Sequence, residues 1–322
     1  MIETVLGALA WLNQWSDPLA WLVVATFVAG AVLDWQDRHG DLARSVTVAA
    51  WVLFAVFWFT LIYHFVFVQK SIVEGIGTLI AVPGCLYVAV LLRRGRDTLF
   101  VLSRAVAVMG AVYLPFEAIL VLQEFLIELV VRQTEFLMGL LGYHPEIVPG
   151  SAIDPDYESF RNTFTFYPRP NYRVAYTIVI ACTGIGSMAI FVGLIAAVRA
   201  PLRRKLRALA VSIPVIYALN LVRNVFIGLS FGTMKMQWVP ELTATVFAFS
   251  LQRDPARVSY YWADRIIAQS ASVVALVAIT WLVVRELPEV LVVIEDLLYM
   301  ATGSEYDLRG ALDIRPVRAD GE

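Results

Sequence analysis

Residues 175–198 read AYTIVIACTGIGSMAIFVGLIAAV, an apolar run that holds a single thiol, Cys182. The run is long enough to cross a bilayer, which takes about 20 apolar residues. Small residues follow the thiol in TGIGS (183–187), and such residues let helices approach closely within membranes. Taken alone, Cys182 fits a packing role, because free cysteine usually behaves as a small buried hydrophobe. A functional role needs support from elsewhere in the chain.

The composition indicates a membrane protein. Of 322 residues, 59% are hydrophobic and 16% are charged, whereas a soluble domain typically carries about 25% charged residues. The net charge is -2, and no basic face suggests a nucleic-acid partner. Cys85 and Cys182 both lie in apolar runs and the three histidines are scattered, so we expect neither a disulfide framework nor a metal site. We expect no cofactor.

Seven apolar segments predict an all-α, polytopic transmembrane helix bundle. They cover residues 19–33, 46–68, 72–92, 99–122, 174–198, 206–231 and 263–284. Arginines cluster in the loops over 93–104 and 199–207, and the positive-inside rule places both loops in the cytoplasm. With seven spans, the N-terminus lies outside the cell and the C-terminus inside.

We expect a single membrane-embedded domain over 1–286, with the candidate site in the half over 170–275. Residues 142–173 predict a structured outer loop with a strand in FRNTFTF (160–166), and residues 123–141 an amphipathic helix at the outer surface or extending the fourth span. The semi-apolar run over 238–251 predicts a half-inserted helix. Residues 287–322 predict a cytoplasmic tail with an amphipathic helix over 287–300.

Polar residues in the sixth span predict a site near the outer surface. Asn220, Arg223 and Asn224 share one helix face by their i, i+3, i+4 spacing, and charges inside a membrane usually face the protein interior. Arg223 and Cys182 each lie about eight residues from the outer end of neighbouring antiparallel spans, a depth of roughly 12 Å. Asp264 then opens the seventh span at the same membrane face.

Simpler roles are open for the charged residues. Arg265, at a span end, can snorkel to the headgroups, and Arg223 can form a structural ion pair, for which Glu117 is a candidate partner. In a functional role, a guanidinium stabilises a thiolate or an oxyanion. It is no ready general base, because it stays protonated. Asp264, Glu117 or a tyrosine could move the thiol proton, and the sequence leaves this choice open.

Three motifs resemble the exosortase/archaeosortase family of membrane cysteine transpeptidases: ACTGIGS (181–187), LNLVRN (219–224) and ADR (263–265). The resemblance covers residues 172–270, and the spaced Cys…Arg…Arg set is its specific feature. It implies that Cys182 is the nucleophile, with Arg223 and Arg265 as catalytic partners. Bacterial members carry histidine at the third position, whereas this chain has no histidine after His144 and matches the archaeal form. Further candidate supporting residues are Asp264, Asn220, Asn224 and Glu117.

The resemblance also implies a substrate class and a location. Such enzymes act on secreted surface proteins, S-layer glycoproteins among them, that end in a short motif, a transmembrane helix and a basic cluster. In archaeal members the motif is Pro-Gly-Phe. Cleavage through a Cys182 acyl-enzyme would be followed by transfer of the new C-terminus to a membrane lipid, at a site open to the outer leaflet of the cell membrane. The sequence gives no indication of oligomeric state.

A membrane transporter or anion carrier is the main alternative, with Arg223 and Arg265 as binding residues. Alkylation of a lone reactive thiol would distinguish a transpeptidase from a carrier, because it should abolish function only if Cys182 is a nucleophile. A seven-helix photoreceptor needs a Schiff-base lysine, and residues 263–284 contain none. A purely structural role would not explain why the Cys182 thiol and the Arg223 guanidinium lie at the same depth.

Overall fold

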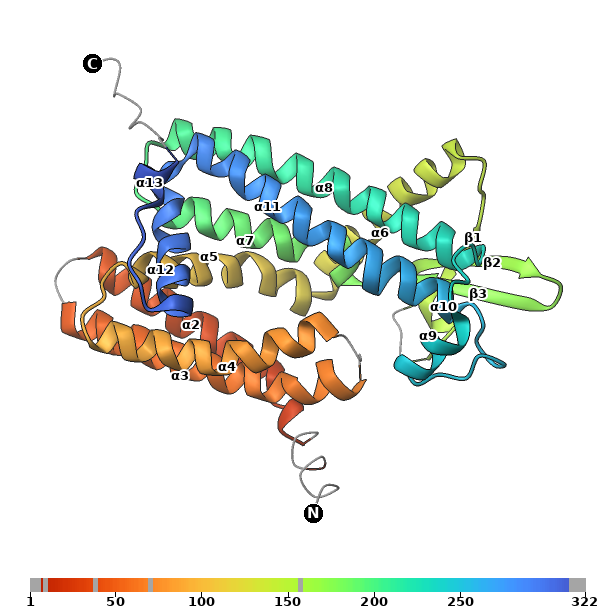
Figure 1. Ribbon diagram of the computed structural model, residues 1–322, viewed down its shortest axis with the longest axis horizontal. Coiled ribbons are helices and arrows are strands. Elements are labelled where there is room, and N and C mark those ends of the chain that lie inside the picture. Colours follow the sequence, from red (N-terminus) through yellow and green to blue (C-terminus); the bar gives the residue numbers. More distant parts are fainter. Residues whose placement is uncertain (1–6, 8–10, 37–39, 69–71, 156–158, 313–322) are drawn as a thin grey trace. The chain divides into compact units, whose positions relative to one another are not determined.

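Long apolar helices dominate the computed structural model (Figure 1), which describes residues 7, 11–36, 40–68, 72–155 and 159–312. Within these residues, six helical segments are long and apolar enough to cross a membrane. They are α2 (Ser16–Trp35), α3 (Gly40–Tyr63) with its π-helical extension η1 (His64–Val68), α4 (Ile72–Arg93), α5 (Leu99–Ala118), α8 (Leu202–Gly232), and the continuous helix of α10 (Arg257–Tyr260), η4 (Tyr261–Ala268) and α11 (Gln269–Glu286). The predicted polytopic helix bundle is confirmed. Its sidedness stays a prediction.

Contacts within the chain define two compact units. Unit 1 comprises Met1–Leu114, Ala189–Val211 and Trp281–Glu322, and unit 2 comprises Pro115–Met188 and Ser212–Thr280. The division falls within α5, α7 (Ile185–Ala197), α8 and α11. The single domain predicted over 1–286 stays a prediction, and residues 313–322 of the predicted tail lie outside the described part of the chain.

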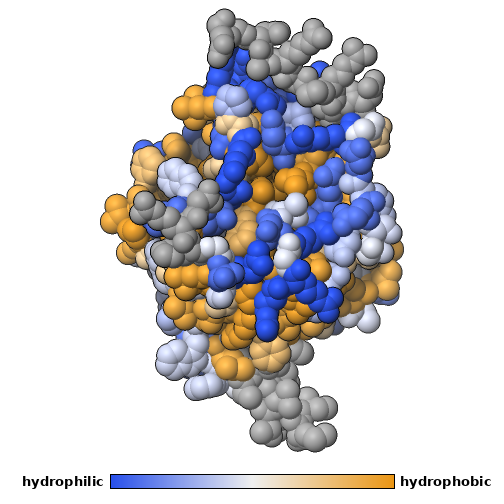
Figure 2. Space-filling model, turned by 90° about the vertical axis from the view of Figure 1, so that its left-hand side faces the viewer, coloured by the Kyte–Doolittle hydropathy of each residue, from blue (hydrophilic) through white to orange (hydrophobic). Residues whose placement is uncertain are grey.

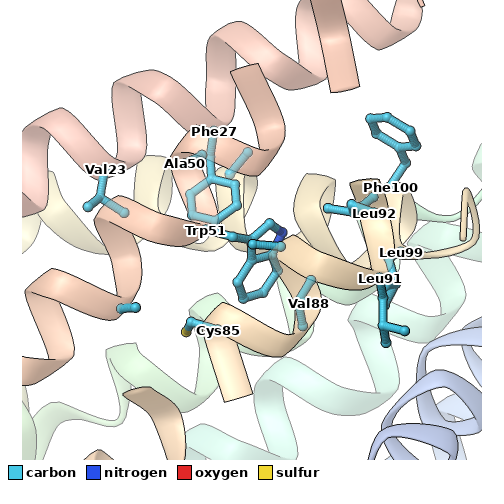
Figure 3. Packing of buried hydrophobic residues seen from close by; sticks show 13 residues of the cluster. Val23, Phe27, Ala50, Trp51, Cys85, Val88, Leu91, Leu92, Leu99 and Phe100 are labelled. Carbon is cyan, nitrogen blue, oxygen red and sulfur yellow. The ribbon is translucent and has the colours of Figure 1, made fainter. Parts of the chain in front are cut away.

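Aromatic packing joins α2 and α3 in unit 1, and a buried cluster extends this core to α4 and α5. Phe27 meets the Trp51 ring edge-on, with ring centroids 5.1 Å apart, and the two side chains face each other in Figure 3. The Trp51 indole nitrogen donates a 2.8 Å hydrogen bond to the Ser103 hydroxyl, which satisfies its one polar group inside the core. Cys85 belongs to the same buried cluster. Its surroundings fit the packing role expected of a free cysteine.

A short helix, α12 (Leu291–Thr302), follows the 3₁₀ turn η5 (Pro288–Val290) where the sequence predicts a helix over 287–300. Leu291 and Val293 are buried on it, as is the carboxylate of Asp296. Asp296 accepts a 2.7 Å hydrogen bond from the Arg96 Nε and a 2.9 Å bond from the Thr98 hydroxyl. The loop before α5 therefore anchors α12 within unit 1.

Arg96→Ala is expected to loosen this anchor. The substitution leaves the buried Asp296 carboxylate without its cation, which costs roughly 3 kcal/mol. It also removes the guanidinium that lies 3.7 Å from the Tyr299 ring centroid. We expect faster proteolysis between α11 and α12 in detergent. Arg94→Ala, an exposed neighbour in the same loop, is the matched control. Equal cleavage of both variants would mean that the ion pair contributes little.

Unit 2 combines helices with a small sheet. Helix α6 (Leu120–Leu140) occupies the position of the helix predicted over 123–141, and Ile119, in an extended conformation, separates it from α5. Three antiparallel strands follow in the order β1-β2-β3: β1 (Glu146–Pro149), β2 (Arg161–Arg169) and β3 (Tyr172–Thr177). Strand β2 occupies the position predicted for a strand, and it forms a long hairpin with β3 (Figure 1).

The segment over 174–198 is not one transmembrane helix, which corrects the sequence-based interpretation. It consists of the end of β3, the 3₁₀ turn η3 (Ile180–Thr183) and the 13-residue helix α7. Phe164 of β2 pairs with Tyr176 of β3, so the apolar run begins in a β-strand that ends at Thr177. Gly184 then takes a left-handed φ of 80°, which changes the direction of the chain between η3 and α7. At 1.5 Å per residue α7 is about 20 Å long, shorter than a bilayer core.

A second short helix, α9 (Pro240–Val246), lies in the semi-apolar run over 238–251. Trp238 before the helix is exposed, and so are Leu242 and Val246, which lie one turn apart on α9. The Trp262 indole nitrogen donates a 3.0 Å hydrogen bond to the Trp238 carbonyl and ties this segment to η4. An apolar, solvent-facing stripe of this kind suits a membrane interface.

Candidate cysteine–arginine site

The thiol of Cys182 lies in a tight turn between a strand and a helix. The Cys182 amide donates a 2.8 Å hydrogen bond to the Val179 carbonyl, which closes the turn η3. The Thr183 hydroxyl donates to the Ile180 carbonyl at 2.7 Å and braces it. Cys182 is a half-buried free cysteine. A 3₁₀ turn followed by the left-handed Gly184 thus presents the sulfur from irregular backbone rather than from a helix face.

Two asparagines of α8 hold the backbone of this turn. The side-chain nitrogens of Asn220 and Asn224 donate to the Cys182 carbonyl at 2.7 and 2.8 Å. They lie one helical turn apart, as their i, i+4 spacing predicts. A side chain at Gly184 would come within 3.1 Å of Asn220, so only glycine allows this approach in a left-handed conformation. The asparagines therefore fix the position of the nucleophile candidate rather than contact the sulfur.

Tyr176, which the sequence analysis did not single out, belongs to the site. Its hydroxyl donates a 3.2 Å hydrogen bond to the Asn224 side-chain oxygen, and it also lies within hydrogen-bonding reach of the Cys182 sulfur. Gly228 of α8 leaves room for the ring, because a Cβ there would come within 3.0 Å of it. The period-2 pattern of residues 172–177 indicates the strand that carries Tyr176. The long apolar run that continues after it made the segment look like part of a spanning helix.

Arg223 forms an ion pair with Asp264. One terminal nitrogen of Arg223 lies 2.7 Å from the Asp264 carboxylate, whereas the sequence had suggested Glu117 for this partner. The Nε of Arg223 is buried and has no hydrogen-bond partner among the described residues. Both groups lie in unit 2, which also contains Cys182. Arg223 consequently keeps donors that are not committed to the ion pair. A role for Glu117 stays a prediction.

Arg265 joins the same carboxylate from the other side. Its Nε lies 3.5 Å from Asp264, and its guanidinium carbon lies 5.9 Å from the Tyr260 ring centroid. Asp264 and Arg265 both belong to the π-helical segment η4. Segments of π-helix are rare and often occur at functional sites. Two guanidinium groups thus lie against one buried carboxylate.

Burial raises the pKa of the Cys182 thiol above its usual value, and a backbone hydrogen bond from Val179 and the charge of Arg223 lower it part of the way back. The hydrogen bond from Tyr176 acts in the same direction as Arg223. Burial also raises the pKa of Tyr176, so its hydroxyl stays protonated at neutral pH. The substrate-free site therefore holds a thiol, together with groups that favour its ionised form.

The rate of Cys182 alkylation by iodoacetamide is expected to report how far this thiol is ionised, because the thiolate is the reactive species. The rate at Cys182 should rise with pH, with a midpoint more alkaline than that of a cysteine-containing peptide measured alongside. Tyr176→Phe removes a hydrogen bond to the sulfur, so the midpoint should move further toward alkaline pH. A midpoint below that of the peptide would show a preformed thiolate instead.

The donor set does not suggest a metal centre: among the described residues, no three His, Cys, Asp or Glu side chains gather as metal ligands would. Apolar membrane helices and a half-buried thiol near paired arginines together define a multi-pass membrane protein with a cysteine–arginine site.

The sequence profile of the transmembrane exosortases matches residues 11–252, and the chain belongs to this family. It is 51% identical to Archaeosortase A of Haloferax volcanii over 309 residues, which cover 93% of this chain and 98% of that protein. It is 46% identical to Archaeosortase A of Natronomonas pharaonis over 302 residues, 92% of each chain. No solved structure matches.

Proposed function

We propose that this protein is a membrane cysteine transpeptidase of the archaeosortase type. It cleaves the C-terminal sorting signal of secreted surface proteins, such as S-layer glycoprotein, through an acyl-enzyme at Cys182, and so enables lipid attachment of their new C-terminus. The sorting signal is a Pro-Gly-Phe type motif followed by a transmembrane helix. The observation that carries the proposal is the half-buried Cys182, fixed by two asparagines near the Arg223–Asp264 ion pair.

In the first half-reaction, the Cys182 sulfur attacks the scissile carbonyl carbon to form a tetrahedral intermediate. Arg223 stabilises the oxyanion through donors that Asp264 does not occupy. The carbon–nitrogen bond then breaks, and the leaving nitrogen takes up a proton. The proton originates from the thiol, and the Tyr176 hydroxyl relays it, because a hydroxyl accepts one proton while it donates its own. The products are a thioester at Cys182 and the released C-terminal helix.

In the second half-reaction, a hydroxyl or amine of a membrane lipid attacks the thioester. The carbon–sulfur bond breaks, the lipid's proton returns to the sulfur through the same hydroxyl, and the substrate protein leaves as a lipid conjugate. Water attacking instead would give a free carboxylate. A site screened from bulk water favours the lipid, which is consistent with a thiol that is only half exposed.

Asp264 and Arg265 act on the reaction through Arg223. Asp264 orients the Arg223 guanidinium at 2.7 Å, and Arg265 offsets the negative charge of that carboxylate from 3.5 Å. We propose that the site faces the outer leaflet, where a secreted substrate would arrive, with the half over 170–275 as catalytic part and 142–173 as outer loop. On this proposal the tail over 287–322 is cytoplasmic.

The test is mass spectrometry of a surface protein whose C-terminus carries a Pro-Gly-Phe motif, a transmembrane helix and a basic cluster. Cells that express this protein should yield a substrate truncated at the motif and increased in mass by a lipid. Cells without it should yield the intact C-terminus. An identical, untruncated substrate in both cells would refute the proposal. An anion carrier, with Arg223 and Arg265 as binding residues, predicts that result together with anion flux into proteoliposomes.

A further inference from the structure

A cavity of about 520 Å³ opens at one end of unit 1, where the two arginine-rich loops meet. Its wall includes apolar side chains such as Phe100 of α5 and Val292 of α12. Four arginines also line it, from four different elements: Arg44 of α3, Arg104 of α5, Arg199 after α7 and Arg309 of α13 (Leu308–Ala311). Figure 2 shows hydrophilic side chains grouped around a hollowed apolar patch on this face.

The charges of the lining do not balance. Its three carboxylates each have an arginine partner already: Asp97 with Arg44 at 2.7 Å, Asp34 with Arg104 at 3.6 Å, and Glu289 with Arg204 at 2.8 Å. Arg199 and Arg309 are exposed and form no ion pair with any described residue. The cavity therefore presents two guanidinium groups that lack an anion.

The paired arginines also keep unused donors. The Nε atoms of Arg44 and Arg104 are buried and have no hydrogen-bond partner among the described residues. Buried donors without partners are uncommon in proteins and cost free energy. Apolar walls such as Phe100 lower the local dielectric and strengthen the attraction between these cations and an anion.

We propose that this cavity binds a phosphate group. The planar fork of a guanidinium matches two phosphate oxygens, and several forks from different directions suit a tetrahedral anion. The mixed lining fits the headgroup of an anionic phospholipid, whose chains would meet the apolar wall, and a soluble phosphate compound has the same charged group. A bound phosphate would link α13 to the ends of α3, α5 and α7, and so stabilise unit 1.

The experiment uses the full chain, delipidated in detergent, and measures retained ligand by native mass spectrometry and the thermal unfolding midpoint. Phosphatidylglycerol is compared with diacylglycerol, which lacks phosphate, and inorganic phosphate with chloride at equal ionic strength. We expect phosphatidylglycerol to bind and to raise the midpoint by about 3 °C or more. The same shift with inorganic phosphate alone would assign the site to soluble phosphate compounds instead of lipid.

The variant Arg199→Gln/Arg309→Gln removes both unpaired cations. Arg94→Gln/Arg203→Gln removes the same charge from exposed positions outside the cavity. Affinity should fall at least about tenfold in the first variant and stay unchanged in the second. Equal affinity in both variants, or equal stabilisation by diacylglycerol, would overturn the proposal. If the first variant does not fold, Arg309→Gln alone applies the same criterion.

Discussion

Cys182→Ser is expected to abolish processing of the surface-protein substrate, with a fall in rate of at least about 10⁴-fold. A serine hydroxyl needs an efficient general base, and the nearby Asp264 carboxylate is committed to an ion pair with Arg223 at 2.7 Å. The substitution keeps the backbone carbonyl that Asn220 and Asn224 hold, so the turn should stay folded. The measurement is the fraction of substrate with an intact C-terminus.

Cys85→Ala is the matched control for this prediction. Cys85 is the other cysteine of the chain and lies in the buried cluster of unit 1. Its replacement should cost about 1 kcal/mol of stability and leave processing unchanged. Membrane insertion of both variants is checked by alkali extraction. Wild-type processing by Cys182→Ser would remove the covalent mechanism, whereas loss of processing in both variants would point to a folding defect.

Hydropathy predicted the membrane helices but misread the segment that carries the thiol. A buried strand, a turn and a short helix in sequence give the same unbroken apolar run as a spanning helix. The β-branched residues of TIVI (177–180) favour an extended chain, and Gly184 adopts the left-handed conformation that ends η3. Cys182 is therefore presented by a turn and not by the face of a spanning helix.

Helical spacing predicted part of the candidate site, because it depends only on residues that are close together in the sequence. Asn220 and Asn224 share a face by helix geometry alone, and both reach one carbonyl. Tyr176 could not be found in this way, because strand pairing of β3 and close packing on Gly228 position it. The pairing of Arg223 with Asp264 likewise depends on tertiary packing. Long-range contacts of this kind are invisible to local sequence patterns.

The π-helical segment η4 carries two adjacent residues of the candidate site, Asp264 and Arg265. Asp264 is 7% exposed and accepts contacts from both Arg223 and Arg265. The wider π-helical turn is a local distortion of a long membrane helix, and such distortions persist where surrounding contacts compensate for them. Here the compensating contact is the buried ion pair.

Arg223→Lys is expected to lower kcat/KM for the processing reaction by about 10²- to 10³-fold. A lysine ammonium can keep the ion pair with Asp264, so stability and membrane insertion should change little. It is a compact charge on a flexible stem and cannot also reproduce the planar fork of donors that the proposed mechanism directs at the reacting carbonyl. The loss should fall mainly on kcat, because the oxyanion forms only in the transition state.

Arg257→Lys provides the matched control, since Arg257 pairs with Asp254 on the exposed side of α10, outside the site. It should leave both kinetic constants unchanged. Thiol reactivity adds a second readout: Arg223→Gln, which removes the positive charge, should shift the alkylation midpoint of Cys182 toward alkaline pH, because the charge of Arg223 lowers the pKa of that thiol. Wild-type kinetics in Arg223→Lys, together with an unshifted midpoint in Arg223→Gln, would reduce the Arg223–Asp264 pair to a structural ion pair and leave the oxyanion without its proposed partner.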